Sequence, residues 1–431
     1  MDARKDVIEV EEKVIGYRRE FHLYAESGWK EFRTTSRIIE ILEGLGLEVK
    51  YGKEVIHIPM VMGRDAEQEI SNHIERGIRQ GGNSKFIEKM EGYTGAVGIL
   101  KTGRPGPVIA IRFDIDANDV IERKDLEHRP TKEGFASVNE GMMHACGHDG
   151  HTAMGLGLAE LLIKEKKNLT GTIKLIFQPA EEGVRGARAM VGKGLLEDVD
   201  YFLAGHLGFN LQTGFIAPKT TGFLSTTKMD AYFYGKGSHA SNAPEEGKNS
   251  LLAAATAVLN IHAISPHSKG ITRVNVGVMQ GGIGRNVIPP AATLKIETRG
   301  ETPELNDYMY DKVAGILNCA AKMYGNNVSM KKEGEALAAD CDEELVDIVK
   351  EVALENKERI TGVINEKYLG GSEDATFMMK SVQERGGLAT YIFFGAETKA
   401  AHHNEGFDFD EAVLMKGICL YKDVILKIAG R

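Results

Sequence analysis

Residues 144–151 read His-Ala-Cys-Gly-His-Asp-Gly-His, which places one thiol, three imidazoles and a carboxylate within eight positions. Cys146 and His148 are separated by a glycine, and such a pair can reach one metal ion only from an irregular loop or a strand end. Cysteine sulfur and histidine nitrogen suit zinc, while additional carboxylate and imidazole ligands would also accept manganese. An isolated Cys-Gly-His is as often a buried cysteine beside surface histidines. Groups further along the chain favour the metal site.

A pair of neighbouring glutamates, Glu181 and Glu182, follows an apolar run that ends at Pro179. Neighbouring side chains diverge in an extended or turn conformation, so that one glutamate can bind a metal ion while the other faces a water molecule on it. Most Glu-Glu pairs are solvated acidic turns. The position of this one, directly after an apolar strand, favours a functional pair.

Three further histidines could complete the set of ligands. His206 ends an apolar run, and His402 and His403 follow another; each taken alone is more typical of a structural residue. Together the ligands are one cysteine, three histidines and one or two carboxylates, which exceeds the four ligands of a single zinc ion. The sequence therefore predicts two divalent metal ions, zinc or manganese, which would lower the pKa of a shared water molecule. A carboxylate that is not a ligand would take the proton.

The elements that must position these groups are short apolar runs at 108–113, 172–177, 200–206 and 389–395, separated by helical patterns. Such runs are typical of the buried strands of a mainly parallel sheet with helices on both faces, so we expect an α/β fold. Sites in these folds lie at the carboxyl ends of the strands. The polar residues at such ends are Asp114, Asp116, Glu181, Glu182 and His206.

The middle of the chain shows a different order of expected strands and helices. Residues 224–333 show a strand, a helix, two strands, a helix and a strand, which is the ferredoxin-like α+β pattern. We therefore expect three segments: 1–223 and 334–431 as one domain, and 224–333 as a domain inserted into it. A polar helical stretch near 64–91 lacks the apolar residues of a core element, and we expect it to be a surface insertion.

Composition excludes several classes of protein. The 431 residues carry a net charge of −9, without a Lys/Arg run, so we expect no nucleic-acid partner. No apolar stretch approaches the roughly 20 residues of a membrane span, and the N-terminal residues are charged and show no secretory leader. The four cysteines lie far apart and form no disulfide framework, which favours a cytoplasmic location.

The motifs in combination resemble the M20 peptidase family, in its amidohydrolase branch, over nearly the whole chain. Those that support the resemblance are Arg18-Arg19-Glu20-Phe21-His22, Glu26-Ser27-Gly28, Asp114-Ile115-Asp116-Ala117, the segment 144–151 and Gln178-Pro179-Ala180-Glu181-Glu182-Gly183. The resemblance implies a mainly parallel-sheet di-metal catalytic domain with an inserted ferredoxin-like lid and dimerisation domain. It also implies a homodimer formed through the lid, and possibly a homologous second subunit.

The family's pattern implies roles for individual residues. Glu181 becomes the general base, and His403 is preferred to His402 as a ligand. Asp114 stands where other branches have a ligand histidine, so we do not expect it to bind metal, while Asp116 is expected to orient the ligands. The implied metal ligands are Cys146, His148, Glu182, His206 and His403.

In the inserted domain, His239 matches the lid histidine that the resemblance implies acts in the partner subunit's active site, where it stabilises an oxyanion. Asn286 and Arg299 match residues that bind the substrate, and a guanidinium suits a carboxylate. Taken alone, Asn286 could belong to a turn and Arg299 to the surface.

The activity implied is cleavage of an acyl-amino acid amide, with p-aminobenzoyl-glutamate as the first expectation, giving p-aminobenzoate and glutamate. The alternatives are another N-acyl or N-benzoyl amino acid as substrate, or a chain that serves as the partner subunit of a hetero-oligomeric hydrolase. A zinc-storage or sensor protein would not need Glu181 or a lid.

Overall fold

The computed structural model describes the backbone of residues 3–431 and the side chains from Glu9 onward; residues 1 and 2 of the charged N-terminal segment lie outside this range. The chain divides into two compact units. The first runs to Thr221 and includes Ala339–Leu369 and Asp374–Arg431, and the second comprises Gly222–Ala338 with Gly370–Glu373. None of the described helices is both long and apolar enough to cross a membrane.

The first unit is built on an eight-stranded sheet. Its strands are β1 (Glu48–Tyr51), β2 (Ala96–Lys101), β3 (Val108–Asp114), β4 (Thr172–Gln178), β5 (Tyr201–Leu207), β6 (Phe215–Ala217), β12 (Gly362–Val363) and β14 (Leu388–Phe394). They are ordered β1-β2-β4-β3-β5-β14-β6-β12, and β4, β3, β5 and β14 are mutually parallel. The apolar runs of the sequence form these four central strands, which confirms the predicted mainly parallel sheet. A separate small sheet pairs β7 (Thr220–Thr221) with β13 (Lys367–Tyr368).

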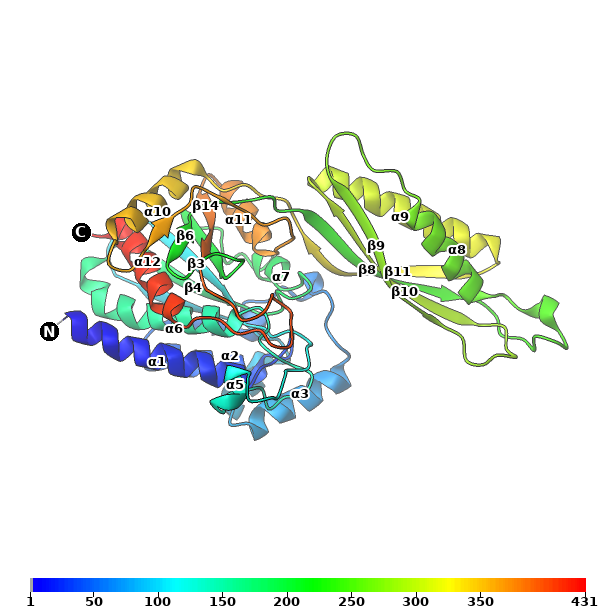
Figure 1. Cartoon of the computed structure of the whole chain (residues 1–431), viewed down its shortest axis with the longest axis horizontal. Coiled ribbons are helices and arrows are strands. Elements are labelled where there is room, and N and C mark those ends of the chain that lie inside the picture. Colours follow the sequence, from blue (N-terminus) through cyan, green and yellow to red (C-terminus); the bar gives the residue numbers. More distant parts are fainter. Residues whose placement is uncertain (1–2) are drawn as a thin grey trace. The chain divides into compact units, whose positions relative to one another are not determined.

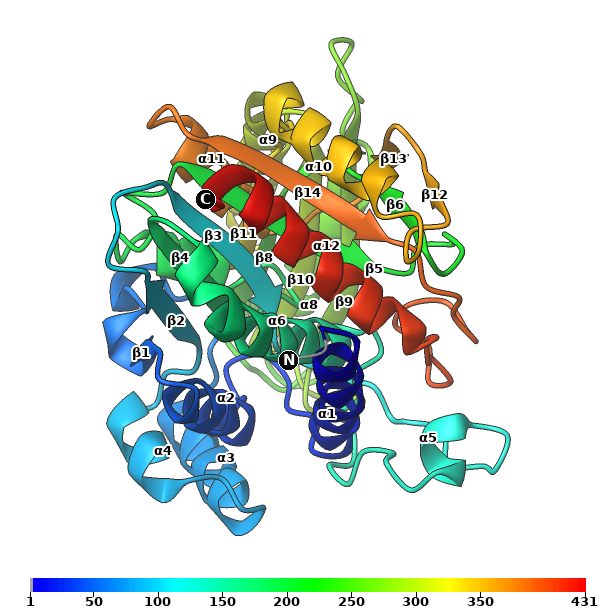
Figure 2. The same cartoon turned by 90° about the vertical axis from the view of Figure 1, so that its left-hand side faces the viewer.

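Helices cover both faces of this sheet. The first unit contains α1 (Ala3–Leu23), α2 (Phe32–Gly44), the short α5 (Arg129–Lys132), α6 (His148–Glu165), α7 (Ala187–Val191), α10 (Glu343–Glu355), α11 (Ala375–Gln383) and α12 (Ala412–Ala429). α6 packs between α1 and α12 on one face, and α11 packs with α7 on the other (Figures 1 and 2). A Cβ at Gly155 of α6 would lie 2.7 Å from both Phe113 and Phe177, so this glycine lets the helix approach the strands closely.

The polar stretch near 64–91 differs in part from its expected place on the surface. It forms α3 (Glu67–Arg79) and α4 (Ser84–Met90). Phe86, Ile87 and Met90 of α4 are buried in the main hydrophobic core. These residues lie on one face of a seven-residue helix, so the polar composition of the whole stretch conceals their contribution. The expectation that the stretch lacks core residues is therefore wrong.

The second unit, called here the inserted domain, contains β8 (Ser225–Tyr234), α8 (Ser250–His262), β9 (Thr272–Gly281), β10 (Ala291–Gly300), α9 (Pro303–Met323) and β11 (Asn327–Ala336). The strands form an antiparallel sheet with the order β11-β8-β10-β9. This βαββαβ order confirms the predicted ferredoxin-like pattern. α8 and α9 pack on one face of the sheet (Figure 1), over a core that includes Phe233, Leu294 and Leu317.

Candidate metal centre

The loop that precedes α6 holds Cys146 in the interior. Gly147 has a φ of 88°, and a Cβ at this position would lie 2.8 Å from Leu207 Cδ1, so the turn requires glycine. His148 is the first residue of α6, and both Cys146 and His148 are buried. The glycine thus provides the irregular backbone that the Cys-Gly-His spacing demands.

Two histidines each have one ring nitrogen fixed by a backbone carbonyl. His148 Nδ1 lies 2.9 Å from the oxygen of Asp116, and His206 Nδ1 lies 2.9 Å from that of Leu207. This assigns the ring proton to Nδ1 and leaves a lone pair on Nε2. His206 Nε2 is 3.3 Å from Cys146 Sγ, and the buried His148 Nε2 has no hydrogen-bond partner among the described residues.

The other side of the centre is formed by Glu182 and His403. His403 Nε2 lies 3.2 Å from Glu182 Oε1, and the His403 amide donates to the carbonyl of Ala145 (2.7 Å). His403 has a φ of 64°, a left-handed conformation that a histidine seldom adopts outside a constrained site. The histidine side chain is 57% exposed and that of Glu182 is 18% exposed, so the centre opens to solvent on this side.

The five predicted ligands form two groups with a shared member. Cys146, His148 and His206 offer ligand atoms within 4.8 Å of one another, and so do Cys146, Glu182 and His403. Sulfur, imidazole nitrogen and carboxylate oxygen together suit zinc or manganese. The unpartnered nitrogen of His148 is the clearest sign that a cation belongs here, because buried polar groups are normally satisfied.

The pKa values of the five predicted ligands shift in both directions, being raised for Cys146, His148 and His403 and lowered for Glu182 and His206. Burial, reinforced by neighbouring imidazoles, lowers the pKa of His206 well below its usual range, so its lone pair is available. Burial and the charge of Glu182 raise the pKa of the Cys146 thiol. A bound divalent cation reverses that direction, because a coordinating thiol loses its proton. Hydrogen bonds to Cys146 and Glu182 raise the pKa of His403 to about 10.

Asp116 connects the ligands to the neighbouring glutamates. Its two carboxylate oxygens accept the backbone amides of Glu181 (3.0 Å) and Glu182 (2.9 Å), while its carbonyl accepts from His148. Glu181 offers an oxygen within 4.8 Å of ligand atoms of His148 and Glu182. One buried aspartate therefore fixes both the loop with the two glutamates and a histidine ring.

Two other polar side chains of segment 144–151 have partners of their own, whereas the buried ring nitrogens of His144 have no hydrogen-bond partner among the described residues. His151 Nδ1 lies 2.5 Å from Asp114 Oδ1, and His151 Nε2 accepts from the amide of Leu207. Asp114 also pairs with Arg112 (2.5 Å). Asp149 forms an ion pair with Arg18, whose Nε lies 2.9 Å from Asp149 Oδ2. These contacts leave His151 and Asp149 in supporting positions, and Asp114 faces Arg112 and His151.

The two adjacent histidines near the C-terminus point to different surroundings. His402 stacks on Phe209 with ring centroids 4.4 Å apart, and its Nε2 lies 3.3 Å from the carbonyl of Leu207. Burial lowers the pKa of His402 to about 4. Only His403 of the pair lies in a group of potential metal ligands among the residues described.

In the inserted domain, His239 and Asn286 are neighbours. The amide of Ala240 donates to the carbonyl of Asn286 (3.0 Å), and His239 forms an isolated bridge with Val287. Both predicted site residues are exposed. His239 Nδ1 accepts from the amides of residues 241 and 242.

Arg299 lies elsewhere in the inserted domain, near the carboxyl end of β10. Its Nε and Nη2 lie 3.1 Å from the two carboxylate oxygens of Glu297. Asn286 precedes the start of β10, whose ten residues extend about 30 Å at about 3.3 Å each. Arg299 and the pair of His239 and Asn286 are therefore at opposite ends of one strand.

Arg185 is a residue of the centre that the sequence did not reveal. Its Nε donates to the carbonyl of Glu182 (2.8 Å) and its Nη1 to that of Gly63 (2.9 Å). A Cβ at Gly28 would lie 2.2 Å from Arg185 Nη2, so the glycine of the Glu-Ser-Gly motif makes room for this side chain. Every residue has a backbone carbonyl, so hydrogen bonds from an arginine to carbonyls correspond to no pattern of residue types in the sequence.

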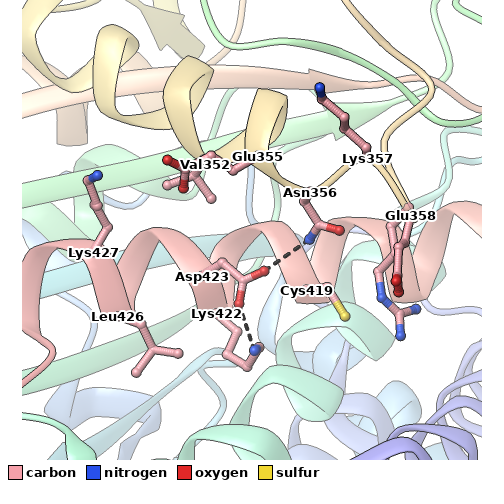
Figure 3. A pocket seen from close by; sticks show the side chains of 11 residues that line it. Val352, Glu355, Asn356, Lys357, Glu358, Cys419, Lys422, Asp423, Leu426 and Lys427 are labelled. Atoms are coloured by element: carbon pink, nitrogen blue, oxygen red, sulfur yellow. Dashed lines mark hydrogen bonds and ion pairs between the residues drawn. The ribbon is translucent and has the colours of Figure 1, made fainter.

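A pocket of about 650 Å³ lies between the end of α10 and α12 (Figure 3). Asp423 accepts from Asn356 (3.0 Å) and pairs with Lys422 (2.6 Å), so its carboxylate is already used. Burial raises the pKa of the Cys419 thiol, which disfavours a nucleophilic role. None of the predicted site residues lines it, and we assign it no chemistry.

Comparison with known proteins identifies the family. A model of "Peptidase family M20/M25/M40" matches residues 110–427. The chain is 49% identical over 403 residues to one of the subunits of p-aminobenzoyl-glutamate hydrolase from Escherichia coli (strain K12), covering 93% of this chain and 92% of that protein. It is 49% identical over 405 residues to indole-3-acetyl-aspartic acid hydrolase of Enterobacter agglomerans, covering 92% of each.

The solved structure of an aminobenzoyl-glutamate utilization protein from Klebsiella pneumoniae has a similar fold. It superposes with a TM-score of 0.85 at 40% identity, covering 99% of this chain and 98% of that one. These matches confirm the resemblance inferred from the motifs, and with it metal-dependent hydrolysis of an amide bond. The chain belongs to peptidase family M20/M25/M40 and is one of its metal-dependent amide hydrolases.

Proposed function

We propose that the chain hydrolyses the amide bond of p-aminobenzoyl-glutamate, releasing p-aminobenzoate and glutamate. The observation that carries the proposal is the cluster of Cys146, His148, Glu182, His206 and His403 beside Glu181. Two relatives at 49% identity are named for conjugates of glutamate and of aspartate, although the acyl groups differ. That common feature supports an acidic amino acid at the amine side of the bond.

We assign the centre two divalent ions, zinc or manganese, because five ligands of mixed type exceed the number that one tetrahedral ion takes. When bound, such ions polarise the amide carbonyl and lower the pKa of a water molecule. Cys146 belongs to both groups of ligand atoms and would hold an ion with the members of either group.

Glu181 acts as the general base in this proposal. It takes a proton from the attacking water and later delivers that proton to the leaving nitrogen, which departs as an amine. Asp116 holds the Glu181 and Glu182 amides, so that the base and the ligand keep a fixed relation. Burial raises the pKa of Glu182, but hydrogen bonding from His403 and the charges of His148 and His403 together lower it to about 2, which suits a cation.

The inserted domain supplies the groups that recognise the substrate. Arg299 binds a carboxylate of glutamate, Asn286 contacts the substrate, and His239 stabilises the oxyanion. A small molecule cannot touch both ends of a ten-residue strand. We therefore propose a homodimer formed through the inserted domains, in which His239 and Asn286 serve the partner's active site.

Two alternatives are kept. The substrate could be another N-acyl or N-benzoyl amino acid. Two relatives are named as individual subunits of a hydrolase. These names also support a homologous second subunit, and the chain would then be the partner subunit of a hetero-oligomeric hydrolase. Four free cysteines, spread along the chain, support a cytoplasmic enzyme.

The proposal is tested by kinetics on p-aminobenzoyl-glutamate and on hippurate with Mn²⁺ or Zn²⁺. We expect a preference for the glutamate conjugate and, in Glu181→Ala, a loss of kcat of about 10²–10⁴-fold with bound metal retained. Preference for hippurate would contradict the substrate, and unchanged activity of Glu181→Ala would contradict the mechanism.

The dimer is tested by mixing two inactive variants. Glu181→Ala subunits lack the base and His239→Ala subunits lack the lid histidine, so a mixed dimer contains one active site with both groups. Activity should return on mixing after subunit exchange. Failure to recover activity in mixed dimers, identified by differential tags, would contradict a histidine that acts in the partner.

A further inference from the structure

The open face of the inserted sheet, opposite to α8 and α9 (Figure 1), brings two arginines side by side. Arg299 on β10 is the direct cross-strand partner of Arg273 on β9. Directly opposed residues of antiparallel strands point to the same face, with Cα atoms about 4.5–5.5 Å apart. Val274, which follows Arg273, packs against the core beneath the helices. Thr298, which precedes Arg299, is buried.

The two arginines differ in their carboxylate partners. Glu297 pairs with Arg299 at 3.1 Å and lies 3.9 Å from Lys228, so one carboxylate serves two cations. In the part of the chain that the structure describes, Arg273 has no carboxylate partner. Its Nη1 donates to the carbonyl of Thr272 (2.9 Å), and its side chain is exposed.

Like charges placed directly opposite one another destabilise a sheet, so the arginine pair has a physical cost that a bound anion would relieve. The Nε and Nη2 of Arg299 face Glu297, which leaves the Nη1 edge for a ligand. A guanidinium binds a carboxylate through two parallel hydrogen bonds. Two neighbouring guanidinium groups therefore suit a molecule with two carboxylates.

We propose that Arg273 binds the second carboxylate of a dicarboxylic amino acid, next to the carboxylate that Arg299 binds. The inference rests on the proposed function and deepens it, because it assigns the selectivity for glutamate or aspartate over glycine to a named residue. A glycine conjugate has one carboxylate and leaves Arg273 unused. The side-chain carboxylate is thus the group that Arg273 distinguishes.

The test compares p-aminobenzoyl-glutamate with p-aminobenzoyl-glutamine, which replaces only the side-chain carboxylate by an amide. The full-length wild type should show the higher kcat/KM for the glutamate conjugate. In Arg273→Gln this ratio should fall by about 10- to 100-fold, the range expected when a charged hydrogen-bonding partner is lost. Arg273→Lys, which keeps the charge but not the fork, should retain part of the preference.

Lys331→Gln is the matched control. Lys331 lies on β11 of the same sheet and pairs with Glu333 at 2.7 Å, so the variant removes one exposed positive charge away from the arginine pair. An unchanged glutamate-to-glutamine ratio in Arg273→Gln, or an equal loss in Lys331→Gln, would overturn the inference.

Calorimetric binding of free glutamate and free glutamine gives a readout that needs no hydrolysis. We expect Arg273→Gln to weaken glutamate binding about tenfold or more and to leave glutamine binding unchanged. If the wild type hydrolyses neither conjugate, the proposed function fails while this measurement still decides on Arg273. Equal binding of both amino acids by the wild type would overturn the inference itself.

Discussion

The metal centre and the inserted domain hold their proposed site residues in opposite ways. In the metal centre, His148 and His206 are buried and each has one nitrogen fixed by a backbone carbonyl. In the inserted domain, His239, Asn286 and Arg273 are exposed. Their hydrogen bonds are to nearby backbone groups.

This difference follows from what each region must bind. A metal ion needs its ligands oriented before it arrives, because immobilising side chains afterwards would consume binding energy. Residues that recognise a substrate, or that serve a partner subunit, must stay accessible until that molecule binds. Substitutions should therefore act on metal retention in the first region and on substrate selectivity in the second.

The largest effect is expected from Cys146→Ser. A hydroxyl does not replace a thiolate ligand. Even the loss of a residue that only orients a ligand lowers metal affinity or activity about 10- to 100-fold. We expect metal affinity and kcat/KM to fall by at least about 100-fold, measured by metal analysis after gel filtration and by kinetics. Cys341→Ser is the control, since that buried thiol contacts the Thr220 carbonyl. Equal metal loss in both variants would show a general effect on folding.

The sequence indicated most of the metal centre because parallel strands bring their carboxyl ends to one edge. This placement marked His206 at the end of β5 and Glu181 just beyond β4 as candidates, although they lie far apart in the chain, and the resemblance to the family implied their roles. The ferredoxin-like order of the inserted domain was equally visible in the alternation of its strands. These features depend on local periodicity, which the sequence records.

Other features depend on how distant side chains fit together. The residue types alone do not distinguish the adjacent histidines 402 and 403; the resemblance to the family favoured His403, which has a positive φ and lies beside Glu182 in the structure. Arg185 holds the Glu182 loop through carbonyl groups, which any sequence provides. The pairing of Arg273 with Arg299 depends on strand register. None of these follows from composition or spacing.

A smaller effect on the metal centre is expected from Asp116→Asn. The amide group turns an NH₂ towards one of the two backbone N–H groups that the carboxylate accepts, so the glutamate loop loses one of its anchors. We expect a loss of about 10- to 100-fold in metal affinity or activity, with the fold retained.

The matched variant is Asp342→Asn. Asp342 also accepts a backbone amide, that of Ala389 (2.7 Å), and contacts none of the metal ligands. It should lower the free energy of unfolding without changing the metal affinity of the folded protein. Chelator competition and urea unfolding separate the two quantities, and a similar drop in metal affinity for both variants would contradict a specific role of Asp116.

The smallest effect is expected in the inserted domain, from Glu297→Gln. The carboxylate of Glu297 pairs with Arg299 and would repel the carboxylates of a substrate, so its removal should lower KM for p-aminobenzoyl-glutamate by about threefold, an electrostatic effect of the size of a partly exposed pair. Metal content should stay constant. Glu333→Gln, which removes a carboxylate paired with Lys331 on strand β11 of the same sheet, should leave KM unchanged. A higher KM in Glu297→Gln would instead show that Glu297 orients the guanidinium, and the inserted domain would then resemble the metal centre in fixing its site residues before the substrate binds.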